Sequence, residues 1–328
     1  MIDFLKLVRY KNLIFLAFIQ YVMQNMVLLP IMQVYGFSMP MNTIYFNLLV
    51  AGTLFIAGGG YVLNDYFDIK IDAINRPDKQ LVGVKISRQS AMLAHQLLTG
   101  LGVICGFILA FLLHSFTLGF IFIVIPGLLW FYSASYKRQL IIGNLVVAFI
   151  ASMSILIVGI TQLAALQTEY GKLIFETPIP HQIYGWIGGF VFFSFLCTWM
   201  REIVKDIEDE KGDREMECHT MPIFWGLKKT KWFLYTLIIL TVSALFAANF
   251  FLIPFEGTLS LRYIVFGIVI PFAVLCYLIY HAKQIEAYRQ ASMLLKIIMF
   301  VGVLYAFVFY YLEAKAFGLV LFNLFIIK

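Results

Sequence analysis

The feature that most limits what this chain can fold into is the repetition of apolar stretches about 20 residues long, the length a helix needs to cross the hydrocarbon core of a bilayer. These stretches are too long, and alternate too little, to be the strands of a membrane barrel. Only 13% of the 328 residues are charged, whereas a soluble domain carries about 25%. The sequence therefore predicts an all-α, polytopic, integral membrane protein.

Nine spans account for the hydropathy pattern. The first lacks a cleavage-site pattern and is too long for the apolar core of a signal peptide, so we expect it to stay in the mature protein. The closing segment, 318–328, is too short to span and is expected to lie at the interface. No linker divides the chain, and residues 1–328 are predicted to form a single domain. The predicted spans are 12–32, 43–63, 91–112, 115–134, 141–164, 183–203, 232–253, 262–281 and 293–312.

The basic residues predict the orientation of these spans. Of the 24 Lys and Arg residues, 20 fall in segments on the N-terminal side of the membrane and four on the opposite side. Such a bias marks the cytoplasmic side, so we expect the N-terminus in the cytoplasm and the C-terminus outside. The net charge of +6 follows from these loops. It calls for no nucleic-acid partner, and no obligate protein partner is implied.

Acidic residues gather in two short stretches on the predicted cytoplasmic side. Of the 18 Asp and Glu residues, four lie in 64–79 and eight in 201–217. The stretches belong to two loops, at about 64–90 and 201–231. In both, an acidic stretch follows an apolar span and is itself followed by a short polar segment and another apolar run, which indicates two related helical halves.

Within each stretch, polar side chains recur at the spacing of one helix face. A single cluster of this kind is most often a solvated helix end. Two clusters with matched phasing on one side of the membrane instead indicate a shared site, because stacked carboxylates repel unless a cation lies among them. The first stripe consists of Asn64, Asp68 and Asp72, and the second of Asp206, Asp209 and Asp213, preceded by Glu202.

Oxygen-only ligands favour a hard cation, and Mg²⁺ is usually shared between a few carboxylates and substrate phosphates. Interleaved basic residues suit the remaining phosphate oxygens. The sequence therefore predicts a Mg²⁺–diphosphate site at the cytoplasmic end of a helical bundle. The interleaved basic residues are Arg76, Lys79, Lys137, Arg138, Arg201 and Lys205.

The same residues resemble the motifs of the UbiA-type membrane prenyltransferase superfamily. The first stripe matches the family's NxxxDxxxD signature and continues into "NRPDK", and the second matches its aspartate-rich DxxDxxxD-type motif. Between them, "YSASYKRQLIIGN" (132–144) is similar to the family's Tyr/Lys-containing segment. The opening "LVRYKN" is similar to its N-terminal Arg and Asn, here Arg9 and Asn12. The resemblance covers roughly residues 5–310.

This resemblance implies nine helices around a central cavity, with Mg²⁺ and an isoprenyl diphosphate at the cytoplasmic mouth. It implies that Asn64, Asp68, Asp72, Asp206, Asp209 and Asp213 hold the metal and position the diphosphate. Lys137, Arg76 and Lys205 are the expected diphosphate cations, whereas Arg138 and Arg201 are equally well explained as membrane-flanking charges. Arg9 either reaches the site or anchors to lipid headgroups, and Asp65 either supports the site or is solvated. The rings of Tyr132 and Tyr136 either stabilise an allylic cation or, as is the better explanation for most aromatic residues of this chain, pack against lipid.

The sequence constrains the identity of the acceptor substrate less than that of the prenyl diphosphate. The stretch "REIVKDIEDEKGDREMECHTMPI" looks most like the branch that makes digeranylgeranylglyceryl phosphate, although Glu217–Cys218–His219 departs from its pattern. The expected reaction is transfer from geranylgeranyl diphosphate to a geranylgeranylglyceryl-phosphate-like acceptor. The alternative within the family is prenylation of an aromatic quinone precursor. An alternative from another class is a cation-coupled transporter, since intramembrane carboxylates often mark ion pathways. The acids, however, lie at span ends.

Overall fold

The computed structural model describes residues 2–37, 41–75, 77–321 and 325–326, and most of these residues are helical. Within this part of the chain, nine helical segments are long and apolar enough to cross a membrane, and each predicted span overlaps one of them. The prediction of an all-α, polytopic membrane protein is therefore confirmed. The segments are Tyr10–Val34, Thr43–Phe67, Arg88–Leu112, Phe116–Ala134, Ile142–Glu176, Ile179–Glu208, Leu227–Phe251, Leu259–His281 and Ile285–Phe317.

Two of the spans change helix type along their length. The first follows the short helix α1 (Ile2–Leu7) and runs through α2 (Tyr10–Val22), the π-helical η1 (Met23–Leu28) and α3 (Leu29–Val34). The eighth runs through α13 (Leu259–Tyr263), the π-helical η5 (Ile264–Val269) and α14 (Ile270–His281). The other spans are α4 (Thr43–Phe67), α6 (Arg88–Leu112), α7 (Phe116–Ala134), α8 (Ile142–Tyr170) with the 3₁₀ turn η4 (Gly171–Glu176), α9 (Ile179–Glu208), α12 (Leu227–Phe251) and α15 (Ile285–Phe317).

Side chains just before the spans explain where several of them start. A helix leaves its first N–H groups without intrahelical partners, and Asn or Ser accept from them readily. Asn42 accepts from the N–H of Ile44 at the start of α4, at 2.8 Å. Ser87 does the same for α6 through Ser90, at 3.1 Å, and Ser115 caps α7.

Glycines let α4 and α6 pack closely. A Cβ placed on Gly59 would come within 2.4 Å of Thr99 Oγ1, and one on Gly102 within 2.6 Å of the Ile56 side chain and 2.9 Å of the Gly52 carbonyl oxygen. Small residues at such positions allow helix backbones to approach in lipid, where apolar side chains alone give little drive for association. Outward-facing rings such as Phe111 and Phe251 remain 77% and 85% exposed, as expected of side chains that face lipid.

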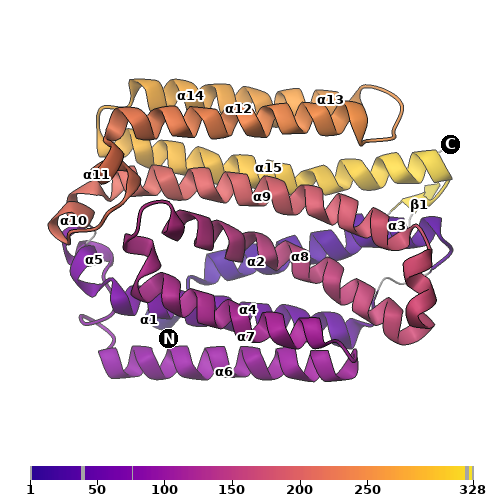
Figure 1. Ribbon diagram of the computed structural model, residues 1–328, viewed down its shortest axis with the longest axis horizontal. Coiled ribbons are helices and arrows are strands. Elements are labelled where there is room, and N and C mark those ends of the chain that lie inside the picture. The colour runs from indigo at the N-terminus through magenta and orange to yellow at the C-terminus, as the bar shows by residue number, and fades with distance from the viewer. Residues whose placement is uncertain (1, 38–40, 76, 322–324, 327–328) are drawn as a thin grey trace.

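The spans lie roughly alongside one another (Figure 1), with α12 and α14 on one side of α9 and α15, and α4, α6 and α7 on the other. Short helices cap one end of the bundle (Figure 1). They include α5 (Ile69–Asn75), η2 (Pro77–Lys79), η3 (Tyr136–Arg138), α10 (Glu210–Glu215) and α11 (Met221–Trp225).

The C-terminal segment lies at the opposite end, where β1 (Val320–Leu321) pairs antiparallel with β2 (Phe325–Ile326). The Tyr310 hydroxyl donates to the Val320 carbonyl at 3.2 Å and ties this hairpin to α15. Both acidic loops are therefore at one end of the bundle, and the chain finishes at the other.

Candidate functional site

Each acidic motif is built on a helix that breaks at the middle aspartate of the motif. α4 gives way to α5 at Asp68, with φ −90° and ψ 1°, and α9 gives way to α10 at Asp209, with φ −94° and ψ 4°. Hydrogen bonds still reach four residues back, from Asp68 N to Asn64 O at 3.0 Å and from Asp209 N to Lys205 O at 2.9 Å. The matching geometry supports the predicted relation between the two halves of the chain.

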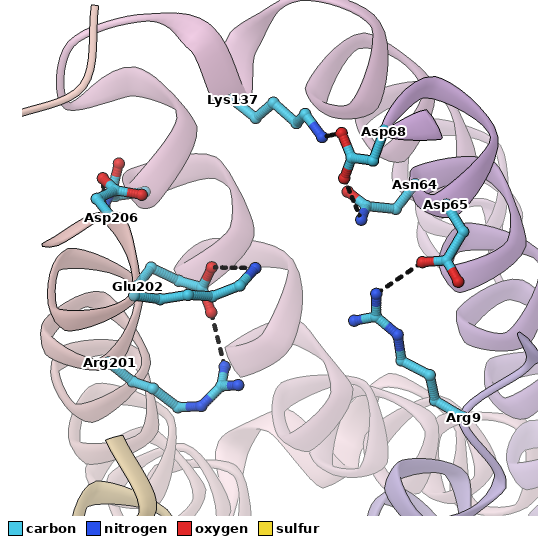
Figure 2. Close-up of polar contacts among 10 residues, drawn as sticks. Arg9, Asn64, Asp65, Asp68, Lys137, Arg201, Glu202 and Asp206 are labelled. Carbon is cyan, nitrogen blue, oxygen red and sulfur yellow. Dashed lines mark hydrogen bonds and ion pairs between the residues drawn. The ribbon is translucent and has the colours of Figure 1, made fainter. Parts of the chain in front are cut away.

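The first motif is held together by its own amide and by a lysine from another helix. Asn64 Nδ2 donates to Asp68 Oδ2 at 2.8 Å, and Lys137 Nζ contacts Asp68 Oδ1 (Figure 2). Asp68 is buried. Asp72 follows one turn later, and its N–H donates to the Asp68 carbonyl at 2.8 Å.

The second motif is held by an amide from α8 and by burial. Asn144 Nδ2 donates to Asp206 Oδ2 at 2.9 Å. Burial raises the pKa of Asp213 to about 6, and the negative charge of Asp209 adds to this effect, while Lys205, Lys137 and Arg138 oppose it. A carboxyl that is buried beside another carboxylate is a group that a bound cation would stabilise in its charged form.

Lys137 connects the two motifs. Burial, followed by the charges of Lys205 and Arg138, lowers the pKa of Lys137 to about 7, while Asp213 raises it. The same ammonium contacts Asp68. Because one side chain interacts with a carboxylate of each motif, the two motifs border a common region. Figure 2 shows Asn64 and Asp68 on one side of this region and Glu202 and Asp206 on the other.

The turn that carries Lys137 packs tightly on the start of α8. A Cβ on Gly143 would lie 2.7 Å from the Lys137 Cα and 2.7 Å from the Tyr136 carbonyl oxygen. Ile141, between them, has a positive φ of 66°. The His219 N–H donates to the Arg138 carbonyl at 2.9 Å and so joins this turn to the loop of the second motif.

Arg9 approaches the site but is already paired. Its guanidinium donates to Asp65 at 2.8 Å (Figure 2) and lies 5.0 Å from the centre of the Tyr61 ring. Burial works against its charge, but Asp65 and, more weakly, Tyr61 and Asp72 raise the pKa of Arg9. The Arg9 side chain is 38% exposed and that of Asp65 19%. Asp65 is therefore paired with Arg9, and the roles of both residues at the site stay predictions.

The remaining predicted residues differ in position. Tyr132 has Glu202, Asp206, Arg9 and Arg201 among its charged neighbours, so it lies between the two halves. Tyr136 instead stacks on Phe131, whose ring is exposed, with centroids 6.0 Å apart. Arg76 lies outside the described residues.

Sequence reasoning did not assign roles to three polar residues that the structure places among the motifs. Asn144 holds Asp206, and Glu202 pairs with Arg201 at 2.7 Å and with Lys205 at 3.9 Å. Asn75 bonds to the backbone of the second motif. An amide that opens or closes an otherwise apolar helix was the available signal for Asn144 and Asn75.

The oxygen donors of the motifs suit Mg²⁺, but they form two groups rather than one cage. Among the described residues, no three Asp, Glu, His or Cys side chains come close enough to hold a single ion. Mg²⁺ commonly binds through one or two carboxylates together with substrate phosphates. The donor set therefore fits an ion completed by a diphosphate.

Below the motifs the bundle interior is mostly apolar, although Gln20, Gln24 and Gln162 are also buried there. A cavity of about 20 Å³ lies between α2, α8, α9 and α15, and the side chains around it include Phe15, Ile155, Phe190 and Phe193. A larger groove of about 460 Å³ lies on the outside of α10, and its charges are balanced. Its charged lining residues are three acids, Glu208, Glu210 and Glu215, and three bases, Lys211, Arg214 and Lys283.

Known proteins resemble this chain in sequence. The sequence model of the UbiA prenyltransferase family matches residues 27–301. A digeranylgeranylglyceryl phosphate synthase from Methanosphaera stadtmanae is 32% identical over 265 residues, which make up 79% of this chain and 85% of that protein.

Solved structures resemble it in fold. An apo UbiA homolog from Aeropyrum pernix K1 gives a TM-score of 0.64 at 13% identity, covering 90% of this chain and 97% of that one. A UbiA homolog from Archaeoglobus fulgidus bound to GPP and Mg²⁺ gives a TM-score of 0.53 at 14% identity, covering 93% and 99%. At these identities the likeness concerns the fold alone.

Proposed function

Because this chain belongs to the UbiA prenyltransferase family, we propose that it transfers a geranylgeranyl group from its diphosphate to a geranylgeranylglyceryl-phosphate-like acceptor. The family resemblance expected from the motifs is confirmed, and the chain is a membrane prenyltransferase. Both substrates are part of the proposal. The observation that carries it is the position of Lys137, which contacts Asp68 of one motif and interacts with Asp213 of the other, above a cavity lined mostly by apolar side chains.

The diphosphate is proposed to bind between the motifs, with Lys137 and Lys205 as its cations. When bound, Mg²⁺ neutralises the negative charge that develops on the departing diphosphate. The residues proposed to hold Mg²⁺ are Asn64, Asp68 and Asp72 from one half and Asp206, Asp209 and Asp213 from the other. The paired state of Arg9 with Asp65 suits a supporting role at the edge of this region.

In the proposed reaction, the bond between the first prenyl carbon and the diphosphate oxygen breaks, and its electron pair leaves with the diphosphate. The acceptor hydroxyl oxygen forms the new C–O bond, and its proton passes to the departing diphosphate. The Lys137 ammonium stabilises charge on the diphosphate, as a preorganised cation does most effectively away from water. Tyr132, placed between the halves, offers a ring face to the allylic cation.

Apolar side chains give the prenyl group its environment. Phe15, Phe190 and Phe193 line the interior cavity, and an allylic cation kept among such groups is protected from water. A cavity of about 20 Å³ is far smaller than a geranylgeranyl chain. Binding of the donor therefore requires side chains of α2, α8, α9 and α15 to move apart. We place this end of the bundle in the cytoplasm, on the basis of the 20 basic residues predicted there.

The test is an assay with purified protein in detergent, labelled geranylgeranyl diphosphate, Mg²⁺ and one acceptor at a time. We expect labelled product and release of diphosphate with geranylgeranylglyceryl phosphate, and loss of both when a chelator removes the metal. Product formed only with an aromatic acid would overturn the acceptor and retain prenyl transfer. Absence of any Mg²⁺-dependent product, together with ion-gradient-driven uptake into vesicles, would favour transport instead.

A further inference from the structure

The side chain of Asn75 joins the two acidic loops. Asn75 is the last residue of α5, three positions after Asp72. Its Nδ2 donates to the carbonyl of Asp209 at 3.2 Å, and its Oδ1 accepts from the N–H of Gly212 at 2.9 Å. One amide thus uses both of its ends on a short stretch of backbone more than 130 residues away.

The two bonds fall at the start of α10. Gly212 is the third residue of this helix, and the N–H at that position is one that a capping side chain normally satisfies. Asp209 is the residue at the capping position, yet within the described structure its own side chain makes no capping hydrogen bond. Asn75 therefore supplies from α5 the cap that α10 lacks locally.

Gly212 fits this contact because it has no side chain. A Cβ at this position would lie 2.5–2.7 Å from the amide nitrogen, oxygen and carbon of Asn75. Since φ at Gly212 is not positive, backbone conformation does not call for glycine here. The close approach of Asn75 does.

We infer that Asn75 is a positioning residue for prenyl transfer, acting by capping α10 from the opposite half of the protein and so fixing Asp209 and Asp213 relative to Asp68 and Asp72. This inference rests on the proposed function, because it assumes that both motifs serve one diphosphate. The physical reason is that α10 has only six residues and little stability of its own. A displacement of about 1 Å at a reacting centre can lower a rate by about 100-fold.

The first test compares Asn75→Ala with Asn42→Ala, which removes the amide cap of α4 at the opposite end of the bundle. We expect Asn75→Ala to lower kcat/KM by about 10- to 100-fold and to raise the Mg²⁺ concentration needed for half-maximal activity. We expect Asn42→Ala to leave both unchanged. Asn75→Asp keeps the acceptor for Gly212 and should recover part of the loss. Asn75→Ala with unchanged kcat/KM and Mg²⁺ requirement would overturn the inference.

The second test measures docking without turnover. Amide hydrogen exchange of residues 210–216 in the detergent-solubilised protein should be faster in Asn75→Ala, while exchange elsewhere in the bundle stays the same. Unchanged exchange at 210–216 would also overturn the inference.

A double variant separates the contact from general damage. Gly212→Ala alone should impair activity by pushing against Asn75, and Asn75→Ala with Gly212→Ala should be no worse than Asn75→Ala alone. Multiplying losses would contradict a shared contact. If the unaltered protein forms no prenylated product but Asn75→Ala still increases exchange in α10, the proposed function fails while the cap itself stands.

Discussion

The two acidic motifs share one backbone design and differ in what holds their carboxylates. Both place the middle aspartate at a helix break with almost the same φ and ψ, at Asp68 and Asp209. In the first motif the buried carboxylate of Asp68 is paired with a cation, Lys137. In the second motif Asp206 is held by a neutral amide, and Asp213 is buried next to another acid.

This difference indicates a division of work between the halves. A carboxylate that is paired with a lysine keeps its charge without a metal ion. A buried carboxylate beside a second one gains most from a cation that arrives with the substrate. We therefore expect the first half to hold Lys137 in place for the diphosphate and the second half to depend more strongly on bound metal.

The largest effects should come from removing one carboxylate from each half. We expect Asp68→Ala and Asp209→Ala each to lower kcat by about 100- to 1,000-fold, the size typical for loss of one preorganised electrostatic group. Expression and membrane insertion should be unaffected, since neither residue is needed to span the bilayer. Diphosphate release is the measurement, with Glu313→Gln, a change of one buried carboxyl to an amide at the far end of α15, as the control. Near-normal activity in both variants would show that the motifs are not the metal site.

Lys137 should matter next, because it serves both halves. We expect Lys137→Ala to raise KM for the prenyl diphosphate and to lower kcat/KM by about 100-fold, whereas Lys137→Arg keeps the charge and loses less. Lys205→Ala, which removes a cation from the second half only, should have a smaller effect. Steady-state kinetics at saturating acceptor give the comparison. Equal losses for Lys137→Ala and Lys205→Ala would contradict a bridging role.

Some features of the two motifs could be predicted from the sequence, and others could not. The helical spacing of Asn64, Asp68 and Asp72 predicted a stripe, and the apolar runs predicted the nine spans, because both depend on local periodicity. The break of each helix at Asp68 and Asp209 was not predicted, because spacing alone does not distinguish a continuous helix from a kinked one. The bonds made by Asn75 and Asn144 depend on packing between distant segments.

The dependence of kcat/KM on pH should distinguish the two halves, because each half controls activity on a different side of the pH optimum. With a pKa of about 7, Lys137 loses its positive charge as pH rises through that value, so diphosphate capture should weaken above it. With a pKa of about 6, Asp213 becomes protonated as pH falls, so metal binding should weaken below it. We expect a narrow bell in kcat/KM, which reports on the free enzyme.

Each substitution should change only one limb, acidic or basic, of this bell-shaped pH profile of kcat/KM. Lys137→Arg should extend activity to higher pH, because arginine stays charged, and should leave the acid side unchanged. Asp213→Asn should lower the maximal kcat/KM and make kcat/KM nearly independent of pH on the acidic side. A profile that is flat from pH 5 to 8 in the unaltered protein would contradict both assignments.

The smallest effect should come from the amide that holds Asp206. Asn144→Ala removes the 2.9 Å hydrogen bond to Asp206 Oδ2 but no charge. Loss of a hydrogen bond to a charged group costs about 1.5–3 kcal/mol, which corresponds to roughly 10- to 150-fold, and the lower part of this range applies if bound metal reorients the carboxylate. We therefore expect a loss of about tenfold in kcat/KM and a higher Mg²⁺ requirement.

The matched control is Asn25→Ala, which removes a side-chain hydrogen bond to the Tyr21 carbonyl in the first span. This variant should leave activity unchanged. If Asn144→Ala were as damaging as Asp68→Ala, the second half would depend on its amide as strongly as the first depends on its carboxylate, and the proposed division of work would be wrong.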